Sequence, residues 1–299
     1  MLEITTEFKD RIAQALTLAR ENYDGSDANF AKKHGINASI YSRVKNGERE
    51  KVLKPEQWLS LGRMLDVAPG ERRWNMARTE VFNVIEEEVK FCKEFSKSRI
   101  FVDDCAIGKT YTAKYLSRTI KNCFYVDASQ AKTKILFARA LAKCIGVDGT
   151  GTYAAIKQNI KYYLNVIPQP IVIIDEAGDL EYASFVDLKE YWNATDGTCG
   201  WYLMGADGLR EKIKNGINRK TNSYKEMFSR LSDKYSYAVP RGKQERIAFY
   251  RRLITDVLSV NIEDTRSLNT IVNKCLQTDN MEGEATGLRR AESLLILLQ

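Results

Sequence analysis

Residues 100–119 read Ile-Phe-Val-Asp-Asp-Cys-Ala-Ile-Gly-Lys-Thr-Tyr-Thr-Ala-Lys-Tyr-Leu-Ser-Arg-Thr. The apolar start, the short polar middle and the helix-like end predict a strand, a phosphate-binding loop and the helix that the loop feeds. Such a loop surrounds nucleotide phosphates with backbone N–H groups and one Lys, and a following Ser or Thr hydroxyl reaches Mg²⁺. Gly108, Lys109 and Thr110 match the end of the pattern Gly-x-x-x-x-Gly-Lys-[Ser/Thr], whereas Asp103 replaces its first glycine. The stretch therefore predicts a site for ATP and Mg²⁺ from a partial match.

A second motif is the apolar run Ile-Val-Ile-Ile at residues 171–174, which leads directly into Asp175 and Glu176. Such a run predicts a buried central strand, and α/β sheets bind ligands at the carboxyl ends of their strands. An Asp beside the loop Thr can hold Mg²⁺ through water, and the adjacent Glu can polarise the water that attacks the terminal phosphate. Because the pair follows Thr110 by about 65 residues, we favour a nucleotide site over a chance match.

Strand-like and helix-like segments alternate through the middle of the chain, which is typical of a parallel sheet with helices on both faces. The predicted strands are residues 99–102, 123–126, 170–174 and 200–205, and the predicted helices are residues 80–95, 109–120, 133–145, 153–166 and 184–193. We therefore expect an α/β domain that begins at residue 76. A small all-α domain, residues 1–75, precedes it, with a linker at residues 67–74.

The N-terminal region carries helical patterns at residues 5–22, 28–34 and 38–45, with a tight turn between the second and the third. Residues 30–47 resemble the helix-turn-helix of phage Cro and repressor proteins, whose second helix enters the major groove. The resemblance implies a core of Ala31, Ile36, Ile40 and Val44. It implies DNA contacts from Asn37, Ser39, Tyr41, Ser42, Arg43 and Lys45. The alternative is a three-helix adaptor that binds protein.

Positive charge is concentrated in one stretch. The chain has a net charge of +7, yet residues 209–252 alone hold thirteen Lys and Arg against four Asp and Glu. A positive field of this kind favours an anionic polymer. A solvated surface is the alternative, but aromatic residues interleave with the charges and favour nucleic acid. These aromatic residues are Tyr224, Phe228, Tyr235 and Tyr237.

The composition argues against several other classes of protein. The six cysteines are scattered and His34 is the single histidine, so neither a zinc site nor a disulfide framework is expected. The single histidine also excludes most nucleophilic triads. No apolar run approaches the roughly 20 residues that span a bilayer, and the first residues lack the pattern of a signal peptide. We therefore expect a cytoplasmic location.

The order of the motifs carries a second resemblance. The phosphate loop, the Asp-Glu strand, the strand-like run Trp-Tyr-Leu-Met-Gly-Ala-Asp at residues 201–207 and Phe-Ser-Arg-Leu at residues 228–231 follow one another. A C-terminal helical region comes next. This order resembles the AAA+ ATPases, and within them the transposition helpers of the phage Mu B type and, more loosely, of the IstB and TnsC types. Some of these also carry an N-terminal helix-turn-helix, so the resemblance extends over almost the whole chain.

The resemblance implies a role for each matching residue. Gly108, Lys109, Thr110 and Tyr111 would contact the nucleotide, Thr110 and Asp175 would hold Mg²⁺, and Glu176 would be the catalytic base. Asp207 would take the place of the first sensor. Arg230, or else Arg219, would be the arginine finger that acts on the ATP of a neighbouring subunit. Residues 76–240 would be the AAA+ nucleotide-binding domain and residues 241–299 its helical lid, with Arg289 or Arg290 as the second sensor. Lys212, Lys214, Arg219 and Lys220 would line a channel for DNA.

Three positions in the loop depart from the family pattern, namely Asp103, Asp104 and Ala106. A Cβ restricts positive values of φ, and extra carboxylates would repel phosphates unless they point outward. We expect ATP to bind nonetheless, with weakened affinity or slow turnover.

The first hypothesis is an ATPase that assembles as a homo-oligomer on duplex DNA when ATP is bound and recruits or activates a transposase. The second is a sequence-specific transcription regulator whose nucleotide-binding domain is degenerate. The third is a helicase loader of the replication type.

Overall fold

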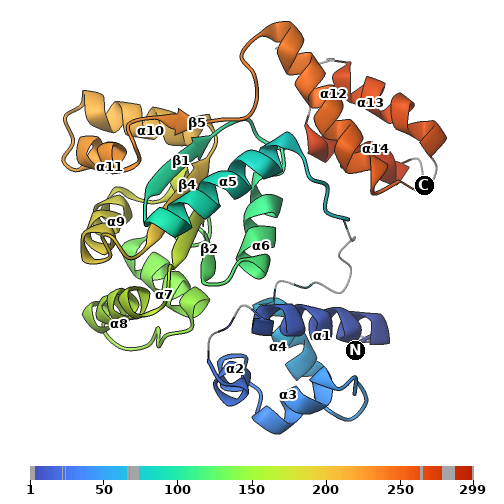
Figure 1. The fold of residues 1–299 in the computed structure, drawn as a ribbon, viewed down its shortest axis with the longest axis vertical. Helices are drawn as coiled ribbons and strands as arrows, with labels where there is room; N and C mark the ends of the chain where they lie inside the picture. The colour runs from blue at the N-terminus through green and yellow to red at the C-terminus, as the bar shows by residue number, and fades with distance from the viewer. Residues whose placement is uncertain are drawn as a thin grey trace. The chain divides into compact units, whose positions relative to one another are not determined.

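The computed structural model describes residues 4–21, 23, 25–65, 67, 74–262, 265–277 and 287–297 (Figure 1). The chain divides into two compact units, of which one is Met1–Arg73 with Arg118–Asn122 and the other is Trp74–Ser117 with Cys123–Gln299. Most of the predicted linker, residues 67–74, lies outside the described residues.

The first unit is helical, as the sequence predicts. Its helices are α1 (Thr6–Glu21), α2 (Asp27–Lys33), α3 (Ala38–Lys45) and α4 (Pro55–Met64). Side chains cap two of them, because Ser26 accepts from the N–H of Asn29 and Asn37 accepts from the N–H of Ile40. Ala31, Ile36 and Val44 are buried in a common core and Ile40 packs against it, so the predicted core is confirmed.

The prediction that Tyr41 contacts DNA is wrong for this structure. Tyr41 is only 2% exposed, and its ring meets that of Phe30 edge-on at 5.3 Å. It lies three residues before Val44, so the two side chains share the inner face of α3. The resemblance alone placed Tyr41 on the outer face.

The second unit contains a five-stranded parallel sheet with the order β2-β3-β4-β1-β5. Its strands are β1 (Ser98–Val102), β2 (Cys123–Asp127), β3 (Ile171–Asp175), β4 (Gly200–Gly205) and β5 (Tyr235–Ser236). Every residue of β3 and β4 is buried, as expected for central strands that helices cover on both faces. The predicted strands are confirmed to within one residue at each end. The short β5 has no apolar run and was not predicted.

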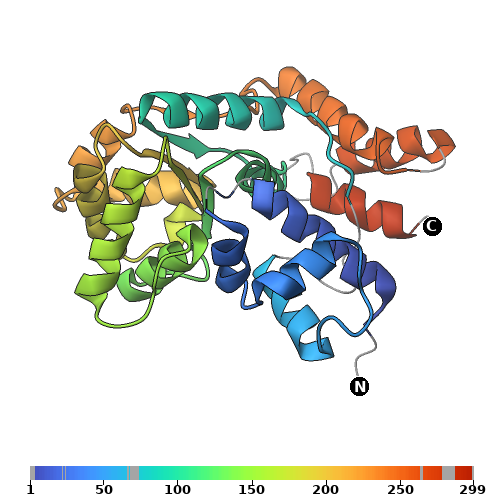
Figure 2. The ribbon, with the colours of Figure 1, turned by 60° about the horizontal axis from the view of Figure 1, so that its bottom comes forward.

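Helices cover both faces of this sheet. On one face, α5 (Glu80–Phe95) packs on β1, β3 and β4, and Phe82 at its start meets Tyr115 of α6 (Lys109–Thr119) edge-on. The helices α7 (Lys134–Ile145), α8 (Tyr153–Val166), α9 (Tyr182–Ala194) and α10 (Asp207–Asn218) lie on the side away from α5 (Figure 2). Right-handed crossovers require this split, because the chain moves across the sheet in one direction from β1 to β2 and in the other from β2 onward.

The C-terminal part of the second unit is a group of helices. The described elements are α12 (Lys243–Ser259), the short η2 (Thr265–Ser267), α13 (Leu268–Leu276) and α14 (Leu288–Leu297). Side chains from α12, α13 and α14 form a separate apolar core, to which Trp74 adds its ring. We call these helices the lid. No helix among the described residues is both long and apolar enough to cross a membrane.

Candidate nucleotide site

The phosphate loop, residues 103–110, leads from the end of β1 into the first turn of α6, so it lies at the carboxyl edge of the sheet. Gly108 has φ of +95°, a conformation that only glycine adopts without strain. Directly after it, Lys109 begins α6 and is 7% exposed. Its ammonium donates to the backbone carbonyls of Asp103 at 2.8 Å and Asp104 at 2.5 Å. Burial lowers the pKa of Lys109, and Cys105, Asp103 and the Asp175–Glu176 pair oppose that shift.

The two aspartates of the loop direct their carboxylates away from this ammonium. Asp103 Oδ2 accepts from the N–H groups of Ala238 at 2.6 Å and Val239 at 2.9 Å. Asp104 Oδ2 accepts from the Tyr250 hydroxyl at 2.5 Å and pairs with Arg246 at 2.6 Å. Of the two possibilities that the sequence leaves open, the outward orientation is therefore the one observed.

Only one of the three unusual loop residues has a strained backbone conformation. Ala106 has φ of +58°, whereas neither Asp103 nor Asp104 has a positive φ. A left-handed conformation costs a residue with a Cβ about 1–2 kcal/mol. The expected strain is therefore confirmed at Ala106 and absent at the two aspartates.

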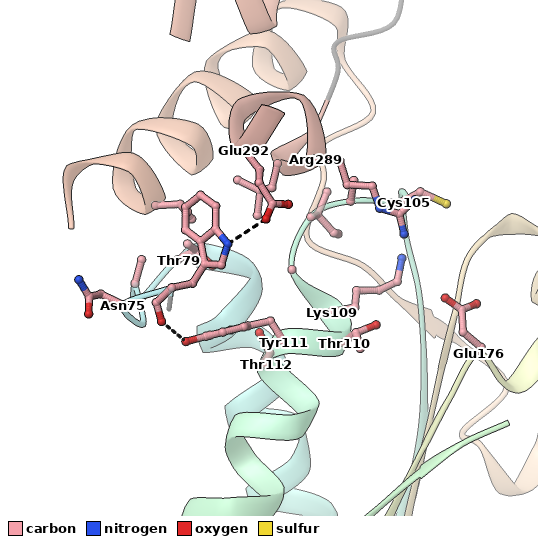
Figure 3. A pocket seen from close by; sticks show the side chains of 17 residues that line it. Asn75, Thr79, Cys105, Lys109, Thr110, Tyr111, Thr112, Glu176, Arg289 and Glu292 are labelled. Atoms are coloured by element: carbon pink, nitrogen blue, oxygen red, sulfur yellow. Dashed lines mark hydrogen bonds between the residues drawn. The ribbon is translucent and has the colours of Figure 1, made fainter. Parts of the chain in front are cut away.

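Asp175 and Glu176 follow β3 at the same edge of the sheet. Asp175 is 1% exposed, and its Oδ1 accepts from the N–H of Glu176 at 3.0 Å while its Oδ2 accepts from the Tyr125 hydroxyl at 3.2 Å. Glu176 has φ of +48°, a conformation that costs roughly 1–3 kcal/mol and is typical of functional sites. Its side chain faces Lys109 and Thr110 (Figure 3). Burial and the neighbouring Asp175 raise the pKa of Glu176, which Lys109 partly offsets.

A cavity of about 270 Å³ joins these groups to the segment before α5 and to the lid. Its lining residues come from the loop, the start of α6, the strand end at Glu176, α12 and α14. They include Trp74, Asn75, Thr79, Cys105, Gly108, Lys109, Thr110, Tyr111, Glu176, Val257, Leu288, Arg289 and Glu292. A mainly apolar hollow with a few convergent polar groups is the usual form of a small-molecule site.

Hydrogen bonds fix the wall of the cavity opposite Glu176. The Trp74 indole N–H donates to Glu292 Oε1 at 3.1 Å, and the Tyr111 hydroxyl donates to the carbonyl of Trp74 at 3.0 Å (Figure 3). At the start of α14, the N–H of Leu288 donates to the carbonyl of Ala106 at 2.7 Å. Arg289, the next residue, is exposed and lines the cavity beside the loop.

The predicted nucleotide contacts thus fall into two groups. The cavity brings together Gly108, Lys109, Thr110, Tyr111, Glu176 and Arg289. Neither Asp175, which is buried at the end of β3, nor Asp207 lines it. Asp207 is the first residue of α10, with its side chain 76% exposed and paired with Arg210 at 3.0 Å. The prediction of a sensor role for Asp207 is therefore corrected, because the chain turns into α10 immediately after β4 and carries this side chain into solvent.

Arg230 lies at the other edge of the sheet. It is exposed near the end of α11 (Tyr224–Arg230) and donates to Asn193 Oδ1 at 2.8 Å. It lines a second, polar cavity of about 630 Å³ together with Ser98, at the start of β1, and Cys199, just before β4. Because the strands are parallel, this is the amino edge, opposite the phosphate loop.

The predicted DNA contacts also differ in their surroundings. Lys212 donates its ammonium to the carbonyls of Gly178 and Leu180 and is only partly exposed, so its prediction as a channel residue is corrected. It holds the turn after Glu176 instead. Several other candidates are exposed, although Arg43 pairs with Glu48 and Lys214 with Glu211. The exposed candidates are Asn37, Ser39, Ser42, Arg43, Lys45, Lys214, Arg219 and Lys220.

The donor set suits a nucleotide with Mg²⁺. The buried ammonium of Lys109, the glycine at positive φ and the start of α6 form a concave donor surface of the kind that phosphates occupy. Mg²⁺ in such sites takes one or two protein oxygens and completes its shell with phosphate and water. Thr110 and Asp175 could supply these oxygens. Within the described residues no group of three or more His, Cys, Asp or Glu could hold a metal by itself, which is compatible with that arrangement.

Sequence reasoning missed the part of the site that lies far along the chain. Trp74 ends the segment treated as a linker, Asn75 follows it directly, and Glu292 lies in α14. The only sequence signal was Trp74 itself, an aromatic residue directly after the three charged residues 71–73. Nothing in the sequence pairs Asp104 with Arg246 and Tyr250, since the interaction depends on the packing of the lid against the loop.

Comparison with known proteins agrees with this geometry over the first part of the second unit. Residues 105–213 match the model of a family described as an AAA domain, a stretch that begins in the loop and ends in α10. No curated protein matches the chain at a significant level. The AAA-type match, the parallel sheet and the loop at its carboxyl edge together support a P-loop ATPase.

Proposed function

We propose that the protein is an AAA+ ATPase that binds duplex DNA in an ATP-dependent manner and recruits or activates a transposase. One observation carries the nucleotide part: Lys109, Thr110 and Glu176, at the carboxyl edge of the sheet, line the same cavity as Arg289 from the lid. Residues some 180 positions apart in sequence thereby offer cationic, hydroxyl and carboxylate groups to one ligand.

Each of these side chains has a definite task in this proposal. Bound ATP would supply the phosphoryl group that is transferred to water. Lys109 and Arg289 would offset the charge of the phosphates, and Thr110 and Asp175 would hold Mg²⁺. Glu176, whose pKa is raised, accepts a proton from the attacking water more readily than an ordinary carboxylate does. The adjacent Trp74, Tyr111 and Val257 exclude water from the apolar end of the cavity.

Duplex DNA is the proposed polymer partner. The exposure of Ser39, Ser42, Arg43 and Lys45 on α3 supports a contact between the first unit and DNA. Lys214, Arg219 and Lys220 support a second contact from α10 and the turn after it, because exposed cations can replace the counterions of DNA phosphates. The transposase partner rests on the resemblance of the motif order to transposition helpers.

The position of Arg230 supports a homo-oligomer. Its guanidinium and the ammonium of Lys109 belong to opposite edges of one sheet. Arg230 can therefore act on a nucleotide only if that nucleotide is held by another copy of the chain. Arg219, the second candidate, is exposed at the end of α10.

Electron microscopy of the full chain with duplex DNA, with and without ATP, tests the whole proposal. We expect oligomers on DNA in the presence of ATP and their loss with the Lys109→Ala variant. A footprint at one defined site that is unchanged by Lys109→Ala would replace the proposal with the transcription regulator. Capture of a helicase instead of a transposase by the ATP-bound protein would replace it with the helicase loader.

A further inference from the structure

Three residues of the phosphate loop contact the lid or the segment that leads to it. Asp103 binds the N–H groups of Ala238 and Val239, between β5 and α12. Asp104 binds Arg246 and Tyr250 of α12, and the carbonyl of Ala106 accepts from α14. The loop is thus attached to three separate parts of the C-terminal segment.

The same two aspartates also hold the phosphate-binding lysine. Their backbone carbonyls accept from the ammonium of Lys109, while their side chains bind the lid and its approach. A shift of α12 would therefore move the two carbonyls that position this ammonium. Glycine at either position could present the carbonyl but could not make the side-chain contact.

We propose that Asp103 and Asp104 are positioning residues that couple the seating of the lid to the affinity of the loop for phosphate. This inference rests on the proposed nucleotide site. With the lid seated, Arg246 and Tyr250 hold the charge of Asp104 away from the phosphates. When the lid moves away from the loop, the carboxylate of Asp104 loses Arg246 and Tyr250 and repels the phosphates. This repulsion and the displacement of Lys109 both weaken phosphate binding.

The coupling must be reciprocal. If a seated lid strengthens phosphate binding, bound nucleotide must favour the seated lid by the same free energy. Nucleotide binding should therefore protect groups that do not line the cavity, notably the amides of Ala238 and Val239.

A double-mutant cycle on the full chain tests the inference, with Mg²⁺-ATP affinity as the first readout. We expect Arg246→Met to weaken binding roughly tenfold, because it leaves the carboxylate of Asp104 without its cationic partner. Adding Asp104→Asn should restore most of the loss, since the amide carries no charge and still accepts from Tyr250. Arg251→Met is the matched control, because Arg251 lies on the same helix and donates to Asn273 within the lid. It should change the affinity less than about twofold.

Hydrogen exchange of the amides at residues 238–239, with and without Mg²⁺-ATP, is the second readout. We expect nucleotide to slow exchange there in the wild type and much less in Arg246→Met. Two results overturn the inference. One is that the effects of Arg246→Met and Asp104→Asn on the free energy of ATP binding are additive. The other is that nucleotide slows hydrogen exchange only at residues 105–112. If the wild type binds no nucleotide, the proposed function fails first and the coupling fails with it.

Discussion

The two halves of the phosphate loop differ in what their residues bind. Gly108, Lys109 and Thr110 line the cavity and follow the family pattern. Asp103 and Asp104 depart from that pattern and place their side chains against the lid and its approach. The residues that match the end of the motif therefore form the ligand-facing half of the loop. The substitutions at its start form the lid-facing half and change how the loop is attached to the rest of the molecule. The variants below probe this contrast, from the largest expected effect to the smallest.

Glu176→Gln should have the largest effect on turnover. The amide cannot accept a proton from water, and a positioned general base contributes typically about 10²–10⁴-fold in rate. Gln keeps the shape and the backbone conformation, so Mg²⁺-ATP should still bind and complexes with DNA should persist. The measurements are steady-state hydrolysis and equilibrium binding in parallel.

The exposed Glu181→Gln is the control for Glu176→Gln and should hydrolyse ATP like the wild type. Rapid release of DNA by Glu176→Gln in the presence of ATP would contradict the assignment of Glu176 as the base.

Lys109→Ala should have the largest effect on affinity. It removes the charged donor at the centre of the loop, and hydrogen bonds to charged groups contribute about 1.5–3 kcal/mol each. We expect Mg²⁺-ATP affinity to fall about 100-fold, measured by calorimetry. The exposed Lys143→Ala on α7 carries the same change of charge and should bind normally. Equal affinities for both variants would show that the ligand-facing half does not bind phosphate.

Gly287→Ala should disturb the lid-facing half without changing the loop sequence. A Cβ at this position would lie 2.5 Å from the carbonyl oxygen of Ala106, so the start of α14 must move away. We expect a loss of stability of about 1–3 kcal/mol and weaker nucleotide binding through displacement of Arg289. Thermal unfolding and ATP titration are the measurements.

Gly208→Ala is the matched control for Gly287→Ala, because a Cβ there has nothing within 4 Å and φ is not positive. If Gly287→Ala left both stability and binding unchanged, the close contact between the start of α14 and the loop at Ala106 would be contradicted.

Ala106→Gly should have the smallest effect, and in the opposite direction. Glycine removes the cost of φ at +58° but increases the entropy of the unfolded chain, so the two contributions partly cancel. We expect stability to rise by about 0.5 kcal/mol, measured by denaturant unfolding. Ala155→Gly, in the exposed first turn of α8, should instead lower it. A loss of stability in both variants would show that the loop is not strained at Ala106.

Sequence patterns predicted the framework of this fold well and its long-range contacts poorly. The runs that became β3 and β4 are apolar along their length, and period and capping mark α5 and α8, so local rules were sufficient there. The residues Lys109, Thr110 and Glu176 of the site were predicted because each belongs to a short motif attached to such an element. Arg289 was predicted only through the resemblance.

The remaining features depend on tertiary packing. Tyr41 was assigned to the surface because the prediction for its helix rested on the resemblance to phage repressors. Its ring is instead buried in the core of the first unit. Lys212 was counted as an exposed charge, although backbone carbonyls 32 and 34 positions earlier bind it. The outward orientation of Asp103 and Asp104 requires partners from residues 238–250, which no local pattern connects to the loop.

Hydrolysis of ATP by the full chain, measured with and without Mg²⁺ and with and without duplex DNA, tests the central claim most directly. The account predicts Mg²⁺-dependent hydrolysis that duplex DNA stimulates and that exceeds the background of Glu176→Gln. Hydrolysis by the wild type no faster than that of Glu176→Gln, under every condition, would contradict it.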